Sequence, residues 1–108
     1  MTLFQGIDIY RRVLPIFKKY NYNLCLYGSL IEKGQGRDVD VMATPKDYMM
    51  PKREKGIEMI TDEIIKYFKE STRVLETYHG VMDTISVVIE IGNYAKLDIV
   101  FVPPTKKD

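Results

Sequence analysis

Residues 38–43 read DVDVMA, a run in which acidic and aliphatic side chains alternate. A period of two predicts a β-strand, because successive side chains on a strand point to opposite faces of the sheet. The aliphatic residues would lie on the face that packs into the core. Asp38 and Asp40 would then lie together on the other face, with their Cα atoms roughly 6–7 Å apart. The fold of this chain therefore has to accommodate two neighbouring carboxylates on one strand.

Two carboxylates at this separation repel each other, and one of them is driven toward protonation unless a cation lies between them. Carboxylate oxygens are the ligands that Mg²⁺ prefers in proteins. The pair Asp38 and Asp40 therefore predicts a divalent-metal site. The alternative is a solvated strand face that carries two charges, because Asp-x-Asp is a common tripeptide.

A Gly-Ser turn lies upstream of this strand. Residues 23–27 form an apolar run that predicts a strand, and Gly28 and Ser29 end it. Glycine permits close approach of the backbone to a ligand, and a serine hydroxyl with free N–H groups at a helix start suits a phosphate. A loop containing Gly34 and Gly36 would join the two strands into a hairpin-like unit, with the turn near the carboxylates. The alternative is an ordinary turn without a ligand.

A third acid, Asp98, stands inside the apolar run at residues 95–102. A carboxylate without a partner is costly to bury. Three strand carboxylates that converge on one metal site would explain all three charges together. The alternative for Asp98 is a salt bridge with Lys96 or Arg37.

The remaining elements follow from hydrophobic periodicity and turn residues. Two long helices and one short helical turn are expected at residues 7–20, 54–70 and 30–33. Strands are expected at residues 23–27, 37–43, 74–78, 84–91 and 94–102. Pro15 lies inside the first helix and is expected to kink or split it. This order predicts an α+β or α/β fold, in which helices flank a mixed β-sheet.

The 108 residues are expected to form a single domain, 1–108, with residues 103–108 as a flexible tail. The formal net charge of +1 shows no basic excess of the kind that marks nucleic-acid-binding proteins. The single cysteine, Cys25, excludes an intramolecular disulfide and is expected to be a small buried core residue. No signal peptide or run of membrane-spanning length is visible, so a cytoplasmic location without a membrane partner is expected.

Three motifs resemble those of the polymerase-beta-type nucleotidyltransferase superfamily: Tyr27-Gly28-Ser29, Asp38-Val39-Asp40-Val41 and Leu97-Asp98-Ile99. The resemblance implies a minimal nucleotidyltransferase fold in which Gly28 and Ser29 hold the triphosphate of a nucleoside triphosphate. It implies that Asp38 and Asp40 bind two divalent metal ions. Asp98 would help to bind the catalytic metal ion and assist deprotonation of the acceptor hydroxyl.

The implied activity is metal-dependent transfer of a nucleoside monophosphate to an acceptor hydroxyl on a protein, a nucleic acid or a small molecule. The implied cofactor is Mg²⁺, with Mn²⁺ as the alternative, because two such ions stabilise both the attacking and the leaving oxygens. Larger relatives add a helical domain for which this chain has no room. The chain resembles minimal members, which often work with a helical protein; some are antitoxins that transfer AMP to a tyrosine of a helical ribonuclease toxin. A helical partner or a homodimer is therefore expected.

Other residues leave alternatives open. Arg37 is predicted to contact the nucleotide; the alternative for it and for Lys33 is a solvated loop charge. His79 is interpreted as a strand-end or loop residue rather than a substrate contact, and Glu90 either lines the same cleft or faces water. The whole domain could also be a binding module that acts with a partner protein without chemistry. The basic segment 46–55 could contact a nucleic acid, although the balanced charge does not indicate it.

Overall fold

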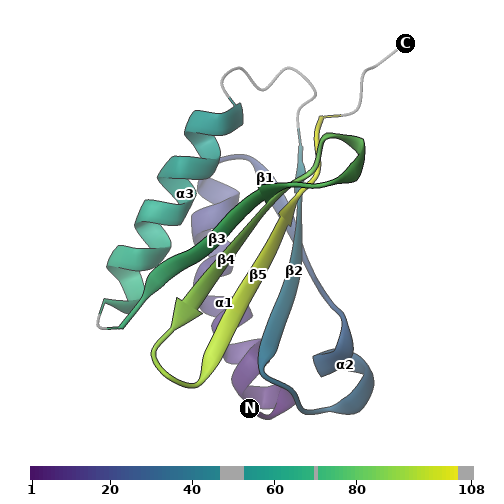
Figure 1. Cartoon of the computed structure of the whole chain (residues 1–108), viewed down its shortest axis with the longest axis vertical. Helices are drawn as coiled ribbons and strands as arrows, with labels where there is room; N and C mark the ends of the chain where they lie inside the picture. The colour runs from purple at the N-terminus through teal and green to yellow at the C-terminus, as the bar shows by residue number, and fades with distance from the viewer. Residues whose placement is uncertain (47–52, 70, 105–108) are drawn as a thin grey trace.

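The computed structural model describes residues 1–46, 53–69 and 71–104, which form one five-stranded sheet and its helices (Figure 1). The helices are α1 (Leu3–Lys19), α2 (Ser29–Lys33) and α3 (Arg53–Phe68), with a 3₁₀ turn, η1 (Val81–Asp83). The strands are β1 (Tyr22–Tyr27), β2 (Asp38–Pro45), β3 (Arg73–His79), β4 (Ile85–Ile91) and β5 (Ala95–Phe101). Every helix and strand expected from the sequence is present.

The sheet is mixed, with the strand order β1-β2-β5-β4-β3. β2 and β5 are parallel, and the other three neighbouring pairs are antiparallel. The parallel pair requires a long connection, which α3 and the β3–β4 hairpin supply. This arrangement confirms the α+β class with helices flanking a mixed sheet.

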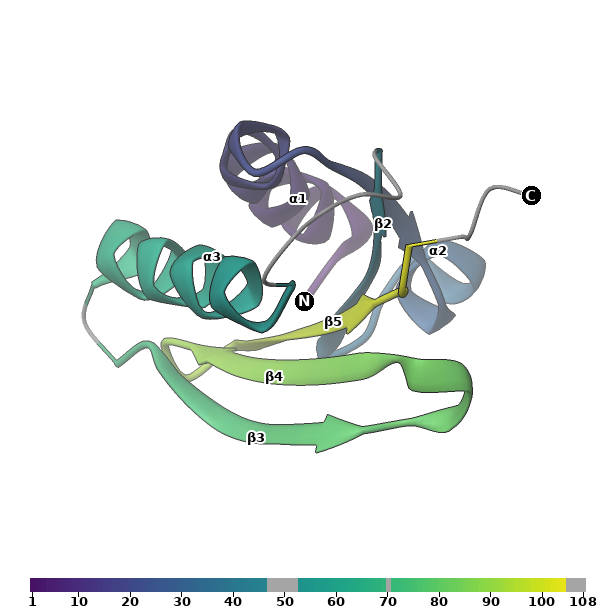
Figure 2. The same ribbon diagram turned by 90° about the horizontal axis from the view of Figure 1, so that it is seen from above.

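Two helices cover one face of the sheet, where the core forms (Figure 2). From α1, Ile9, Val13 and Phe17 recur every four residues and are buried, as an amphipathic helix requires. The hydroxyl of Tyr10 donates a hydrogen bond of 2.7 Å to the carbonyl of Leu24 and so ties α1 to β1. The buried face of the sheet therefore lies under α1 and α3.

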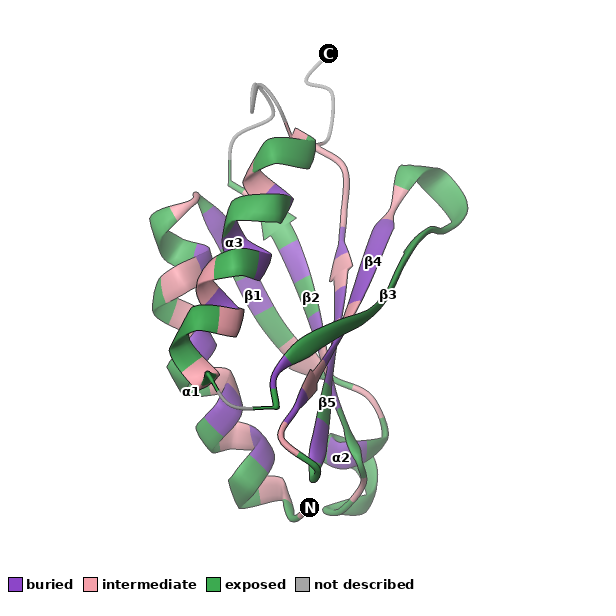
Figure 3. Ribbon diagram, turned by 60° about the vertical axis from the view of Figure 1, so that its left-hand side comes forward, coloured by how far each residue is buried: buried purple, intermediate pink, exposed green. Residues whose placement is uncertain are grey.

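The opposite sheet face, called here the open face, lies away from both long helices (Figure 3). The burial pattern alternates along β2, where Val39, Val41 and Ala43 are buried. Asp38 is exposed and Asp40 is partly buried. The period-two prediction for this strand is therefore confirmed.

Three details differ from the expectations. The first helix begins at Leu3 rather than residue 7, because Thr2 and Gln5 form a capping box that fixes its first turn. Pro15 lies within α1 but does not split it. Cys25 was expected in the core and is exposed instead. The two-residue period of β1 explains this error, because Cys25 pairs with Met42 and shares the open face with Tyr27.

The predictions made for a basic contact at 46–55 and for a flexible tail at 103–108 depend on residues 47–52 and 105–108, which lie outside the described residues. Among the helices that the structure describes, none combines the length and hydrophobicity needed to cross a bilayer.

Candidate functional site

Strand register brings the predicted acids to one patch of the open face. Tyr27 lies opposite Asp40 in the β1–β2 pair, and Asp40 lies beside Asp98 in the β2–β5 pair. Neighbouring strands are about 4.8 Å apart, so these three residues form a row across the sheet. Asp38 lies two residues before Asp40 on the same face, beside Lys96. The structure thus places Asp38, Asp40 and Asp98 on one surface.

The Gly-Ser turn adjoins the carboxylate row. Gly28 precedes α2 with a φ of +92° and a ψ of −164°, a conformation that side-chain-bearing residues rarely adopt. A Cβ added to Gly28 would overlap the carboxylate of Asp40. Ser29 opens α2, where the first backbone N–H groups of a helix have no intrahelical partner. The backbone of this turn therefore approaches Asp40 as closely as only glycine permits.

The loop that follows the turn is held by the N-terminus of the chain. The N–H of Leu3 donates to the carbonyl of Gly34 at 3.0 Å, and the N–H of Gly36 donates to the carbonyl of Met1 at 3.0 Å. These bonds fix the path from α2 to the start of β2. The position of the Gly-Ser turn relative to Asp38, the first residue of β2, is therefore fixed.

The carboxylates of Asp40 and Asp98 lie in an unfavourable electrostatic environment. Burial raises the pKa of Asp40, and repulsion from Asp98 and then Asp38 raises it further. Burial likewise raises the pKa of Asp98, with added repulsion from Asp38 and Glu76. Both groups therefore favour protonation more than ordinary aspartates do, unless a cation is bound nearby.

Asp98 carries an oxygen without a partner. Its Oδ1 is buried and accepts no hydrogen bond. Within the described residues, the alternative ion pair of Asp98 with Lys96 or Arg37 is not formed. An unsatisfied buried carboxylate oxygen costs about 1–3 kcal/mol or more. A ligand that binds this oxygen would offset that cost.

The donor chemistry of the patch suits Mg²⁺ or Mn²⁺, which bind carboxylate oxygens. The orphaned Oδ1 of Asp98 and the mutual repulsion of the acids both fit a bound cation. In the part of the chain that the structure describes, however, no three such side chains lie close enough together to hold a metal ion. The acids share a surface, and their side chains would have to turn toward one another to share an ion.

The other predicted residues fall into different places. Arg37 is exposed just before β2, and its carbonyl accepts a hydrogen bond of 3.1 Å from the N–H of Lys96. Glu90 pairs with Arg73 of the edge strand at 3.3 Å. His79 ends β3 and is exposed, as interpreted from the sequence, and it lines a cavity beside α3.

Sequence reasoning missed the part that two residues play in this surface. Tyr27 was noted only as part of a motif, yet burial and the nearby charges of Asp40 and Asp98 raise the pKa of its hydroxyl. Glu76 reaches the patch through the strand order, which places β3 beyond β4. Only the pairing of distant strands could have revealed Glu76, because no local pattern marks it.

Comparisons with known proteins define the fold further. No protein-family model matches the chain, and no curated protein matches it. Structures of terminal uridylyl transferase 4 from Trypanosoma brucei are similar to it. The form with bound GTP has a TM-score of 0.60 at 20% identity and covers 93% of this chain. The forms with bound dUTP and CTP have TM-scores of 0.59 and 0.58 at 18% identity, covering 85% and 88% of it.

The chain spans only 33–35% of the length of these structures. At this identity the likeness concerns the fold. The described chain therefore has the fold of one part of a nucleotidyltransferase, and its carboxylate patch is a candidate site within that fold.

Proposed function

We propose that this chain is a minimal, metal-dependent nucleotidyltransferase domain of the polymerase-beta type. It would transfer a nucleoside monophosphate from a nucleoside triphosphate to an acceptor hydroxyl. The observation that carries the proposal is the row of Asp40 and Asp98 beside the Gly28 turn, with repelling carboxylates and an orphaned Oδ1. The fold likeness to a uridylyl transferase crystallised with nucleotides supports it.

In the proposed reaction the acceptor oxygen attacks the α-phosphorus, the bond from the α-phosphorus to its bridging oxygen breaks, and pyrophosphate leaves. Asp38, Asp40 and Asp98 would hold Mg²⁺ or Mn²⁺, which would supply charge stabilisation for the attacking and leaving oxygens. Asp98 would also receive the acceptor proton, the role that the family resemblance implies for the third aspartate.

The turn would hold the triphosphate. Gly28 lets the backbone approach, and the free N–H groups and hydroxyl at Ser29 would donate hydrogen bonds to phosphate oxygens. Arg37 is exposed beside Asp38 and would contact the same phosphates. A cation there would counter part of the negative charge that the three carboxylates and the triphosphate bring together.

The acceptor would approach the open face of the sheet. Neither α1 nor α3 covers this face, so the carboxylate row is left open on the side from which an acceptor would approach. We therefore expect a second chain, either a helical protein or another copy, to complete the acceptor pocket. The resemblance to antitoxin-like members extends the proposal to a protein hydroxyl, such as a tyrosine, as the acceptor.

The test uses the four nucleoside triphosphates labelled at the α-phosphate, with Mg²⁺ and a clarified cell extract as the source of acceptors. Label should become covalently attached to one macromolecular fraction, and Asp98→Asn should reduce this attachment at least 100-fold. Asp8→Asn is the matched control, because Asp8 is an exposed acid on α1 that pairs with Arg12. Equal labelling by the wild type and the Asp98 variant would reject the mechanism.

A non-catalytic binding module is the second candidate. It is favoured by the absence, in the described residues, of three side chains placed to hold one metal ion. Such a module would bind nucleotide or partner without releasing pyrophosphate. Nucleotide binding with no covalent labelling in any extract fraction would support it over the enzyme.

A further inference from the structure

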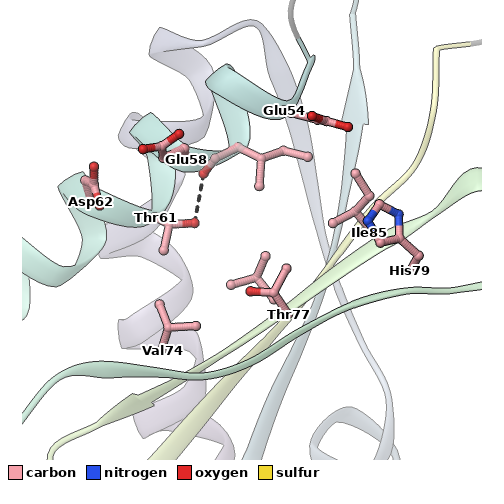
Figure 4. A pocket seen from close by; sticks show the side chains of 10 residues that line it. Glu54, Glu58, Thr61, Asp62, Val74, Thr77, His79 and Ile85 are labelled. Carbon is pink, nitrogen blue, oxygen red and sulfur yellow. Dashed lines mark hydrogen bonds between the residues drawn. The ribbon is translucent and has the colours of Figure 1, made fainter.

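A cavity lies on the helix-covered side of the sheet, away from the carboxylate row. It has a volume of about 420 Å³ and runs between α3 and the strands β3 and β4 (Figure 4). We call it the α3–β3 groove. It takes no part in the site proposed above, because the acids of that site lie on the open face.

The floor of the α3–β3 groove is apolar. Ile57, Ile85 and Val87 are buried beneath it, while Val74 from β3 keeps 39% of its surface exposed. Every residue of β3 is exposed, including those that face the helix layer. The two long helices therefore leave the outer strand uncovered, and apolar surface remains there for another element to cover.

One rim of the groove is acidic. Glu54, Glu58 and Asp62 line it from α3, and all three are exposed (Figure 4). They follow one another at intervals of four residues, so they form a row about 12 Å long on one side of the helix. Like charges at this spacing weaken a helix. No ion pair relieves them among the residues that the structure describes.

We propose that the α3–β3 groove binds a cationic amphipathic helix of another protein. Its apolar side would cover Val74 and the floor, and lysines or arginines on three successive turns would face the acidic row. Charge complementarity favours a cationic helix as the partner, because basic residues on successive turns of a helix would match the spacing of the acidic row. The same acidic row would repel a nucleic acid. A small cation would contact only part of the acidic row.

A second copy of this chain fits the groove less well. The described basic residues of α1 include two that are already paired, Arg12 with Asp8 and Lys19 with Glu63, each at 3.0 Å. The apolar face of α1 is also buried in the core of its own chain, so it is not available to cover the groove of another copy. The proposal does not depend on nucleotidyl transfer, since the groove and the carboxylate row lie on opposite faces of the sheet.

The test uses a fluorescent synthetic helix with leucines along one face and lysines on three consecutive turns of its flank. It should bind the wild-type chain with micromolar affinity, and affinity should fall as salt concentration rises. Glu58→Lys should weaken binding at least tenfold, whereas Asp8→Lys, with the same charge change elsewhere on the helix layer, should not. Asp38→Asn/Asp40→Asn should bind as the wild type does, which separates this result from the proposed enzyme.

Methyl resonances of Ile57, Ile85 and Val87 in the wild-type protein provide a second readout that needs no variant. They should shift when the peptide is added and stay unchanged with an equally charged peptide that lacks leucines. Binding that is indifferent to Glu58→Lys, or methyl groups that do not respond, would overturn the proposal. So would a dimer in sedimentation that Glu58→Lys dissociates, because the occupant would then be a second copy.

Discussion

At the scale of the residue, the unpaired buried oxygen of Asp98 indicates a ligand-binding site rather than a position in the hydrophobic core. A core position would not retain a buried carboxylate oxygen without a partner beside a second carboxylate. Burial raises the pKa of both Asp40 and Asp98, and repulsion from neighbouring carboxylates raises it further. The negative charges of these carboxylates therefore lower the folding stability of the protein, as is common at ligand-binding sites.

Replacing Asp98 with asparagine should stabilise the unliganded protein at neutral pH. A raised pKa means that the folded state binds more protons than the unfolded state. The stability of the wild type therefore falls as the pH rises from the pKa of Asp98 in the unfolded state to its pKa in the folded state. The free-energy cost of the charged Asp98 carboxylate is fully present above its pKa in the folded state. We expect Asp98→Asn to increase the free energy of unfolding by roughly 0.5–1 kcal/mol, because solvent partly screens these charges.

Urea unfolding at pH 4 and pH 7 checks this prediction. The variant should be more stable than the wild type at pH 7, and the difference should shrink toward pH 4. Asp8→Asn serves as the control, since Asp8 is exposed in an ion pair on α1. A loss of stability in Asp98→Asn at pH 7 would mean that the charged form is favourable in the free protein.

Magnesium should raise the melting temperature through the same carboxylates. A ligand that binds only the folded state adds about 1.4 kcal/mol of stability at ten times its dissociation constant. For a domain of this size that corresponds to about 6 °C. Thermal melts with and without Mg²⁺ should show this rise in the wild type and none in Asp38→Asn/Asp40→Asn.

At the scale of the element, the turn between β1 and α2 links the two parts of the proposed site. Gly28 has a positive φ and no room for a Cβ beside Asp40. Gly28→Ala should destabilise the protein by about 1–3 kcal/mol and abolish nucleotide binding, because the turn would move from the carboxylates. Gly34→Ala offers the matched control: φ is +74° there, yet open space surrounds the added Cβ.

Calorimetric unfolding and nucleotide titration of the two variants check this prediction. Gly34→Ala should lose stability from backbone strain alone and keep its nucleotide affinity. If Gly28→Ala bound nucleotide as well as Gly34→Ala, the turn would have no role in phosphate binding.

The elements also show how far sequence reasoning reaches. The alternation in β2 predicted the strand and the face of Asp38 and Asp40, because side-chain period is a local property. The same rule, applied to β1, would have placed Cys25 on the open face, but its apolar neighbours suggested the core instead. The position of Glu76 beside the patch depends on the order β1-β2-β5-β4-β3, which arises from long-range pairing and leaves no local pattern.

At the scale of the whole molecule, the two faces of the sheet differ in character. One is covered by α1 and α3 except along the outer strand, and the other carries the carboxylate row without a helix over it. Both faces therefore offer surfaces that another protein could cover, one with acids on α3 and one beside the proposed nucleotide site.

The decisive measurement is a calorimetric titration of the purified chain with non-hydrolysable analogues of the four nucleoside triphosphates, with and without Mg²⁺. The proposed site predicts binding of at least one analogue that requires Mg²⁺ and disappears in Asp38→Asn/Asp40→Asn. Binding that persists in this double variant, or no Mg²⁺-dependent binding of any analogue by a folded sample, would contradict it.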